Sequence, residues 1–338
     1  MANGKLGLVV NPMSGRDVRR LAARATNMTH EAKRDIVARV AAGADAMGVS
    51  DIYITKEPFR ISSMALEHMG LKARVHVVEH PLNNDASDTE RTVAAFRAAG
   101  CGTFVSLGGD GTNRAIVRAW SDVDLIPLST GTNNVFPGLV EPTVAGMVAG
   151  LNACGELAGA DNIKARCKVL RVRAPARDDV GLIDAVLLRR DHVGNLLPFD
   201  AQRIERILLT RAEPASIGMS PIGGLLHPVY AEDDHGLLVS VDQRRGRALH
   251  APLSPGLFAA VAVRDVSVIG FDVAVPFSGP CVLALDGDRD LKVDEGGVAS
   301  VSLRRDGPYV IDVEAAMRWA VAAGIMARSK HQFGNPTV

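Results

Sequence analysis

The first 155 residues alternate short apolar runs with stretches of helical periodicity, and this alternation constrains the fold more than any other feature. The apolar runs have the length of strands and lie at 5–10, 51–55, 73–79, 103–107 and 124–129. Between them, stretches such as 31–48 and 87–100 place Ala, Val, Ile and Met three or four residues apart. Strands that alternate with helices form right-handed crossovers and a parallel sheet covered on both faces. We therefore predict a Rossmann-like parallel α/β domain over 1–155.

The pattern changes after about residue 160. From there to about 315, the chain consists of short Val- and Leu-rich runs separated by turn residues. Asp-Gly at 286–287, Gly-Gly at 296–297 and Asp-Gly at 306–307 are dipeptides typical of β-hairpins. We predict an antiparallel, sandwich-like β domain over 156–315, with the final stretch 316–338 packing back onto the first domain. Two domains also suit a chain of 338 residues.

Three of the predicted parallel strands end in loops rich in glycine and short polar residues, at 11–15, 108–112 and 129–134. Parallel strands place such loops at one edge of the sheet, where their N–H groups can converge on an anion. A helix that opens at Thr112 adds a favourable field for negative charge. The loops together predict a polyphosphate site. Its expected residues are Asn11, Ser14, Gly15, Gly108, Gly109, Gly111, Thr112, Gly131, Thr132, Asn133 and Asn134.

Asp110 is unexpected in the middle of this glycine-rich turn. A carboxylate ~4 Å from a phosphate charge costs about 4 kcal/mol at an effective dielectric near 20. A Mg²⁺ ion that bridges Asp110 and the phosphates would reverse the sign of this interaction. Alternatively, Asp110 accepts the proton of an attacking hydroxyl, as phosphoryl transfer often requires. A third interpretation is that Asp110 points away and binds a local backbone N–H group.

Composition excludes several classes of partner. Lys+Arg and Asp+Glu are equal at 38 each, so no net charge attracts nucleic acid or an anionic membrane. No apolar run approaches the ~20 residues of a membrane span, and the N-terminus lacks the order of a signal peptide. The four cysteines form no CxxC pair, which favours reduced thiols. We expect a cytoplasmic protein that binds neither nucleic acid nor membrane.

The loops at 11–15, 108–112 and 131–134 resemble the nucleotide loops of the superfamily of NAD kinases and diacylglycerol kinases, whose signature is Gly-Gly-Asp-Gly-Thr. The stretches 127–146 and 216–229 look closest to the ATP-NAD kinase-like branch named for acetoin catabolism protein X. The resemblance implies an α/β domain followed by a β-rich domain, with the active site in the cleft between them. It also implies ATP as the phosphoryl donor, Asp110 at the catalytic centre, and a homodimer or homotetramer.

The same resemblance suggests residues on the acceptor side. Asp184 stands where NAD kinases carry an Asn-Glu pair that holds the dinucleotide, so it keeps one acceptor but lacks the amide. Ser220, Gly223 and Gly224 correspond loosely to a substrate loop. Asp286 and Asp288 match the Asp-Gly-Glu of lipid kinases, although Asp-Gly is also what a hairpin turn requires. We expect Asp286 as an alternative base, and Asp110, Asp286 and Asp288 as candidate Mg²⁺ ligands.

No lysine lies in the three loops, so arginines such as Arg16 and Arg114 are candidates to neutralise phosphate, although Arg16 is more consistent with a solvated surface residue. The leading hypothesis is an ATP-dependent small-molecule kinase that phosphorylates a hydroxyl of NAD or a related metabolite, as in NADP biosynthesis. The alternative is a nucleotide-binding accessory or regulatory protein of an acetoin-type catabolic pathway, without kinase turnover. A lipid kinase is a third possibility, with less support because no amphipathic basic helix is evident.

Overall fold

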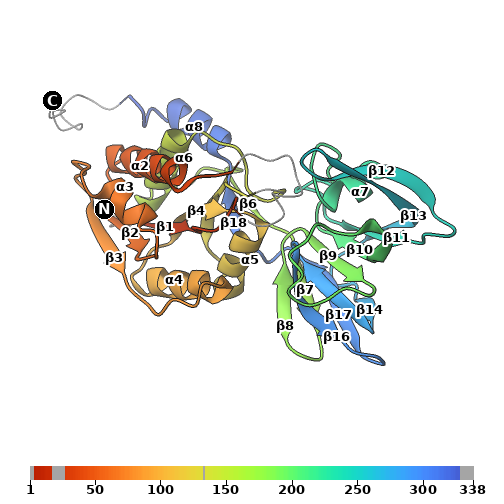
Figure 1. Ribbon diagram of the computed structural model, residues 1–338. Helices are drawn as coiled ribbons and strands as arrows, with labels where there is room; N and C mark the ends of the chain where they lie inside the picture. Colours follow the sequence, from red (N-terminus) through yellow and green to blue (C-terminus); the bar gives the residue numbers. More distant parts are fainter. Residues whose placement is uncertain (1–3, 17–26, 132–133, 328–338) are drawn as a thin grey trace.

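A seven-stranded sheet with the order β3-β2-β1-β4-β5-β18-β6 forms the centre of the first domain (Figure 1). The computed structural model describes residues 4–16, 27–131 and 134–327. All neighbouring strands of this sheet are parallel except β18 and β6, which are antiparallel. The five strands expected from the sequence are confirmed. The bounds are β1 (Lys5–Val10), β2 (Asp51–Thr55), β3 (Arg74–Val78), β4 (Thr103–Gly108), β5 (Asp124–Ser129), β6 (Lys164–Arg166) and β18 (Tyr309–Ile311).

Helices cover both faces of this sheet. Alternate residues of β1 point to opposite sides, so that Leu6 and Leu8 pack in one apolar cluster and Val9 packs in another. The first cluster lies under α2 (His30–Ala46), α3 (Ile61–Leu66), α6 (Pro142–Ala153) and α8 (Val313–Ala322). The second lies under α4 (Ala86–Ala98) and α5 (Asp110–Ala119). Both faces are therefore buried, as a parallel sheet requires.

The second domain is a sandwich of two antiparallel sheets (Figure 1). The larger sheet has the order β12-β13-β11-β10-β9-β15-β16, and the smaller has the order β14-β17-β7-β8. Apolar side chains of both sheets, among them Leu187, Leu283, Phe277 and Val301, form the core between them. The predicted sandwich-like fold is confirmed. The bounds are β7 (Val169–Arg173), β8 (Asp178–Gly181), β9 (Asp184–Leu188), β10 (Ile204–Leu209), β11 (Gly236–Val241), β12 (Arg247–Ser254), β13 (Leu257–Ile269), β14 (Val275–Ser278), β15 (Cys281–Leu285), β16 (Asp288–Val293) and β17 (Val298–Arg304).

The chain passes between the domains at two adjacent points. It leaves the first sheet after β6 and returns to it at β18, and these two strands pair with each other. The Cys167 amide donates to the Pro308 carbonyl at 2.9 Å, and the Gly307 amide donates to the Cys167 carbonyl at 3.1 Å. The pairing thus assigns 164–166 and 309–311, which fall inside the predicted range 156–315, to the sheet of the first domain.

The last described helix, α8, packs on the first domain beside α6. Residues 328–338, the end of the tail expected to return there, lie outside the described part of the chain. Within the described residues, no helix combines the length and the apolar character needed to cross a bilayer.

Candidate active site

A cavity of about 600 Å³ lies beyond the carboxyl ends of β1 and β4, where the second domain approaches the first. Most of the residues expected from the three loops line it. They are Asn11, Ser14, Gly15, Gly109, Gly111, Thr112, Gly131 and Asn134, together with Asp110. The second domain contributes Leu196, Asp286 and Asp288. Thr132 and Asn133, also expected here, lie outside the described residues. We call this cavity the cleft.

Hydrogen bonds join the three loops into one rim. The Asn11 side-chain amide donates to the Thr112 hydroxyl at 2.8 Å, which connects the first loop to the second. The hydroxyls of Ser14 and Thr130 lie 2.7 Å apart, which connects the first loop to the third. The Thr130 amide donates to the Gly108 carbonyl at 3.1 Å, which connects the third loop to the second. The rim is held by its own polar groups before any ligand binds.

Close approach explains three of the glycines in the rim. A Cβ atom on Gly131 would lie 2.4 Å from Asn134 Oδ1, and one on Gly109 would lie 2.7 Å from the same atom. A Cβ atom on Gly108 would lie 2.4 Å from the Cβ atom of Thr112. Gly108 does not line the cleft, so it acts through Thr112 rather than by direct contact.

Lys33, which the sequence analysis missed, supports the first loop from beneath. Its side chain is fully buried on α2, and its ammonium donates to the carbonyls of Asn11 at 2.9 Å and Pro12 at 2.7 Å. The available signal was a lysine among the apolar positions of the helical pattern at 31–48. A positive charge therefore lies directly behind the loop expected to hold phosphate.

Asp110 is the first residue of α5 and is only 8% exposed, yet it lines the cleft. Its carboxylate accepts hydrogen bonds from the backbone amides of Phe136 at 2.9 Å and Val135 at 3.2 Å. Burial and the nearby negative charge of Asp286 raise the pKa of Asp110 to about 7. The carboxyl is therefore poised to exchange a proton near neutral pH.

Asp286 occupies the turn between β15 and β16, with a left-handed φ of 49°. Its carboxylate accepts hydrogen bonds from the backbone amides of Leu182 and Ile183, each at 2.7 Å. Burial raises its pKa to about 6, although the charge of Arg114 and these hydrogen bonds act in the opposite direction. Asp286 thus faces the cleft and also serves the hairpin turn.

Asp184 is the third member of this acidic group. Burial, together with the charges of Asp286 and Asp110, raises its pKa well above the ordinary value. Its Oδ1 atom is buried and has no hydrogen-bond partner within the described residues. The Asp184 carboxyl therefore holds its proton to a higher pH than an exposed carboxyl does. Each of the three carboxyl groups has a pKa above its ordinary value, because each is buried.

Arg114 neutralises carboxylates in this structure. Its guanidinium, only 2% exposed, lies 3.1 Å from Asp288, 3.6 Å from Asp179 and 3.6 Å from Asp290. Arg114 thus connects α5 of the first domain to strands of the second. The expectation that its charge serves phosphate is not supported, because three carboxylates already surround it. Arg16 lies on the surface, with its guanidinium 2.7 Å from His30 Nε2.

The structure does not bring Ser220, Gly223 and Gly224 to the cleft. All three are buried in the short helix α7 (Ser220–Gly224) of the second domain. The Ser220 hydroxyl donates to the Arg211 carbonyl, and Cβ atoms on the two glycines would overlap Leu209 and the backbone of Glu213. Their small size lets α7 pack closely, so their expected role in the acceptor pocket needs correction.

No set of three metal-binding side chains is present among the described residues, so Asp110, Asp286 and Asp288 do not form a complete protein-only site. The oxygens of Asp110 and Asp286 already accept backbone hydrogen bonds. Asp288 lies at the edge of the cleft, 3.1 Å from where a Cβ atom of Gly111 would stand. Mg²⁺ typically binds through one or two carboxylates plus substrate phosphates, so these residues fit an ion that arrives with a nucleotide.

Comparisons with known proteins agree with this architecture. Residues 6–156 match the ATP-NAD kinase N-terminal domain, and residues 168–306 match the acetoin catabolism protein X C-terminal domain. The chain is 31% identical over 335 residues to acetoin catabolism protein X of Cupriavidus necator, which covers 93% of this chain and 92% of that protein. The chain belongs to the acetoin catabolism protein X family. The family's two domains thus lie on either side of the crossing between β6 and β7.

The fold is also similar to that of a solved structure described as "a putative diacylglycerol kinase" from Bacillus anthracis str. Sterne. The TM-score is 0.50 at 12% identity, and the similarity covers 92% of this chain and 98% of that one. At this identity the likeness shows the fold alone, a kinase-type arrangement of an α/β domain and a β-rich domain.

Proposed function

We propose that this protein transfers the γ-phosphoryl group of ATP to a hydroxyl of a small-molecule acceptor, with NAD or a related metabolite as the first candidate. The observation that carries the proposal is Asp110, a buried carboxyl with a pKa of about 7 that lines the cleft beside a rim of three glycine-rich loops. Membership of a family whose first domain matches the ATP-NAD kinase supports the same reaction class.

In this proposal the rim holds the triphosphate. Backbone N–H groups of the glycines and the first turn of α5 bind its oxygens, and the charge of Lys33 acts from behind the first loop. Mg²⁺ held by Asp288 and the phosphates would neutralise charge that develops on the transferring group. The acceptor oxygen forms a bond to the γ-phosphorus while the bond to the β–γ bridging oxygen breaks, releasing ADP.

Asp110 then takes the proton that leaves the acceptor hydroxyl. A base whose pKa lies near the working pH combines a sufficient ionised fraction with an adequate affinity for the proton. Asp184 is not among the described residues that line the cleft, but its carbonyl accepts a hydrogen bond from the Asp286 amide at 3.2 Å, so it helps to position Asp286. Leu196 of the second domain adds an apolar contact at the rim of the cleft.

The test measures ADP release with ATP, Mg²⁺ and each acceptor in turn: NAD, NADH, a panel of hydroxylated metabolites and detergent-solubilised diacylglycerol. Asp110→Asn should lower kcat by about 10²–10⁴-fold. Asp122→Asn, a matched change at an exposed residue of the first domain, should remain within about twofold of the native protein. Turnover that is absent with every acceptor, or unchanged in Asp110→Asn, would refute the proposal.

One observation favours a second candidate, a nucleotide-binding accessory or regulatory protein of an acetoin-type catabolic pathway. Oxygens of both Asp110 and Asp286 accept hydrogen bonds from backbone amides, which holds them in structural roles. Calorimetry distinguishes the two candidates, because tight ATP binding without product over hours would support the accessory role.

A further inference from the structure

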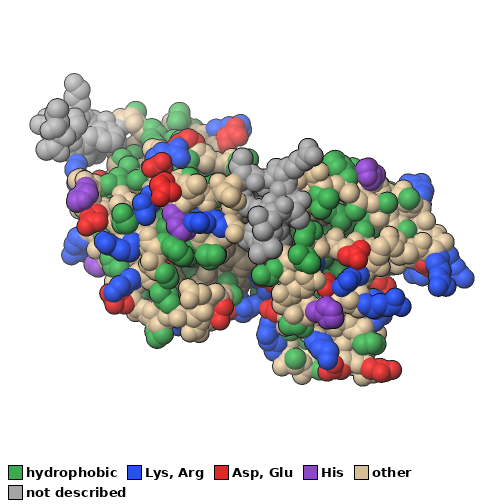
Figure 2. All heavy atoms as spheres, in the orientation of Figure 1, with side chains coloured by type: hydrophobic (Ala, Val, Ile, Leu, Met, Phe, Trp, Pro, Cys, Tyr) green, Lys and Arg blue, Asp and Glu red, His purple; other side chains and the backbone are tan. Residues whose placement is uncertain are grey.

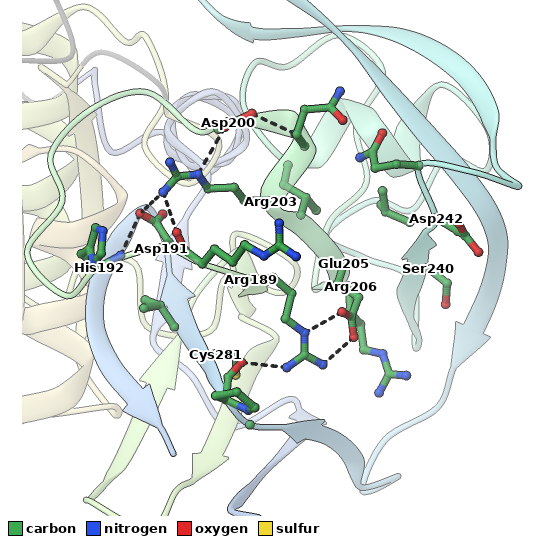
Figure 3. Close-up of a pocket in the computed structure, with 18 of the residues that line it drawn as sticks. Arg189, Asp191, His192, Asp200, Arg203, Glu205, Arg206, Ser240, Asp242 and Cys281 are labelled. Atoms are coloured by element: carbon green, nitrogen blue, oxygen red, sulfur yellow. Dashed lines mark hydrogen bonds and ion pairs between the residues drawn. The ribbon is translucent and has the colours of Figure 1, made fainter. Parts of the chain in front are cut away.

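A cavity of about 1490 Å³, larger than the cleft and apart from it, lies in the second domain (Figure 3). It is formed where β9 and β11 end and where β10 and β15 begin, and none of its residues lines the cleft. Small-molecule sites typically measure about 300–1,000 Å³, so this cavity has room for a ligand of nucleotide size. We call it the arginine cavity.

Positive charge is concentrated in the arginine cavity although the chain as a whole is balanced. Seven basic residues line it against four acidic ones. The basic residues are Arg189, Arg190, Arg203, Arg206, Arg244, Arg264 and Lys292, and the acidic residues are Asp191, Asp200, Glu205 and Asp242. In the space-filling view, basic side chains also gather over the outer end of the second domain (Figure 2). An excess of positive charge in a concave surface favours an anionic ligand.

Two of these arginines are fixed into the wall. Arg189 forms a two-pronged ion pair with Glu205, at 2.6 and 2.8 Å. Arg203 lies between Asp191 at 3.3 Å and Asp200 at 3.2 Å, as Figure 3 shows. These acidic residues therefore hold the side chains of Arg189 and Arg203 in place in the wall of the cavity.

Other arginines of the cavity have no such pairing. Among the described residues, no carboxylate forms an ion pair with Arg190, Arg244 or Arg264. Planar guanidinium groups match the geometry of phosphate oxygens. Beside them, Ile204, Val241 and Val282 supply an apolar surface. This combination suits a ligand with an organic body and phosphate groups, and the absence of Phe, Tyr and Trp from the described lining does not favour nucleic acid.

One segment of chain connects the arginine cavity to the cleft. Residues 189–193 line the cavity, and Leu196, three residues farther on, lines the cleft. Arg289 anchors this segment, because its carbonyl accepts from the Gly194 amide at 2.8 Å and its guanidinium donates to the Asn195 carbonyl at 3.0 Å. Arg289 adjoins Asp288, which lines the cleft. A ligand that moves this segment therefore acts on both sides of it.

We propose that the arginine cavity is an effector site for a phosphorylated small molecule, and that its occupancy changes nucleotide binding in the cleft through residues 189–203. The reaction proposed for the cleft does not use this cavity. The binding part stands independently of the proposed function, whereas the coupling part rests on ATP binding in the cleft.

Binding is tested by calorimetry with adenosine 3′,5′-bisphosphate as the probe. Arg264→Glu should weaken its binding by about tenfold or more, which corresponds to 1.4 kcal/mol. Arg173→Glu is the matched control, because Arg173 is also an exposed strand arginine but lies in the smaller sheet. The affinity of Arg173→Glu for the probe should stay within about twofold of that of the native protein. Equal binding by Arg264→Glu, or displacement of the probe by ATP in direct competition, overturns the site.

Coupling is tested by measuring ATP affinity with and without saturating probe. The native protein should show a change of about fivefold or more, within the usual range of allosteric coupling, and Arg264→Glu should show none. An unchanged ATP affinity in the native protein overturns the coupling. The cavity could instead contact a second copy of this chain, and sedimentation tests this alternative. If Arg264→Glu forms an assembly of lower mass than the native protein does, the cavity is a contact between copies and the proposal is refuted. Asp110→Asn should bind the probe with native affinity. Loss of the proposed reaction can therefore be distinguished from loss of the effector site.

Discussion

Replacing Asp110 by Asn should stabilise the protein relative to the native form as the pH rises, while it lowers kcat by about 10²–10⁴-fold. Since one pKa unit corresponds to 1.36 kcal/mol, raising the pKa of this buried group from 3.8 to about 7 costs the ionised folded protein about 4 kcal/mol. The folded state binds its proton more tightly than the unfolded state. The stability that this proton provides is complete below the unfolded pKa of 3.8 and is lost as the pH rises through about 7.

The Asn side chain avoids this loss because it does not ionise. Between about pH 5 and pH 8, proton linkage should raise the unfolding free energy of the variant, relative to that of the native protein, by roughly 2.5 kcal/mol. A weakened hydrogen bond to the amide of Phe136 or Val135 offsets about 1 kcal/mol at every pH, so it does not alter the pH dependence.

The assay is urea unfolding of the native protein and the Asp110→Asn variant at several pH values. The difference in unfolding free energy should increase between pH 5 and pH 8. A difference that stays constant across this interval would show that Asp110 is not a buried group with a raised pKa, and the argument for a base at this position would fail with it.

Two further substitutions test the rim of the cleft. Gly108→Ala should lower the unfolding free energy by about 1–3 kcal/mol and weaken ATP binding, because its Cβ atom would meet that of Thr112. The control is Gly102→Ala, where a Cβ atom meets nothing within 4 Å. This control should change neither the unfolding free energy, measured in urea, nor the ATP affinity, measured by calorimetry. Lys33→Met should leave the carbonyls of Asn11 and Pro12 without their charged donor, which lowers the unfolding free energy by about 1–3 kcal/mol and weakens ATP binding. Lys72→Met, a change at an exposed residue, should leave both quantities unchanged in the same assays. A native-like Gly108→Ala protein or a native-like Lys33→Met protein would contradict the account of the rim.

The first-domain half of the site could be predicted because its information is local. Each glycine-rich loop directly follows an apolar strand, and a parallel sheet brings the ends of its strands to one edge. Asn11, Asp110 and Asn134 therefore could be placed together without knowledge of side-chain contacts.

The acidic group of the second domain depends on a pairing that the sequence does not encode locally. Register between β9 and β15 places Leu285 opposite Ala185, so that Asp286 follows next to Asp184. These two residues lie about a hundred positions apart in the chain, and no periodic pattern connects them. Ser220, Gly223 and Gly224 show the opposite error, because small residues that permit close packing look like those that admit a ligand.

The adjacent strands β6 and β18 have a consequence for how this architecture can change. Because the chain leaves and re-enters the first sheet through two strands that pair with each other, everything between Cys167 and Gly307 is inserted at one place. A short turn that joined these two points would close the first sheet without altering the order of its strands. Replacement of the second domain by a different insert would therefore leave the strand order of the first sheet, and the three loops at its edge, unchanged.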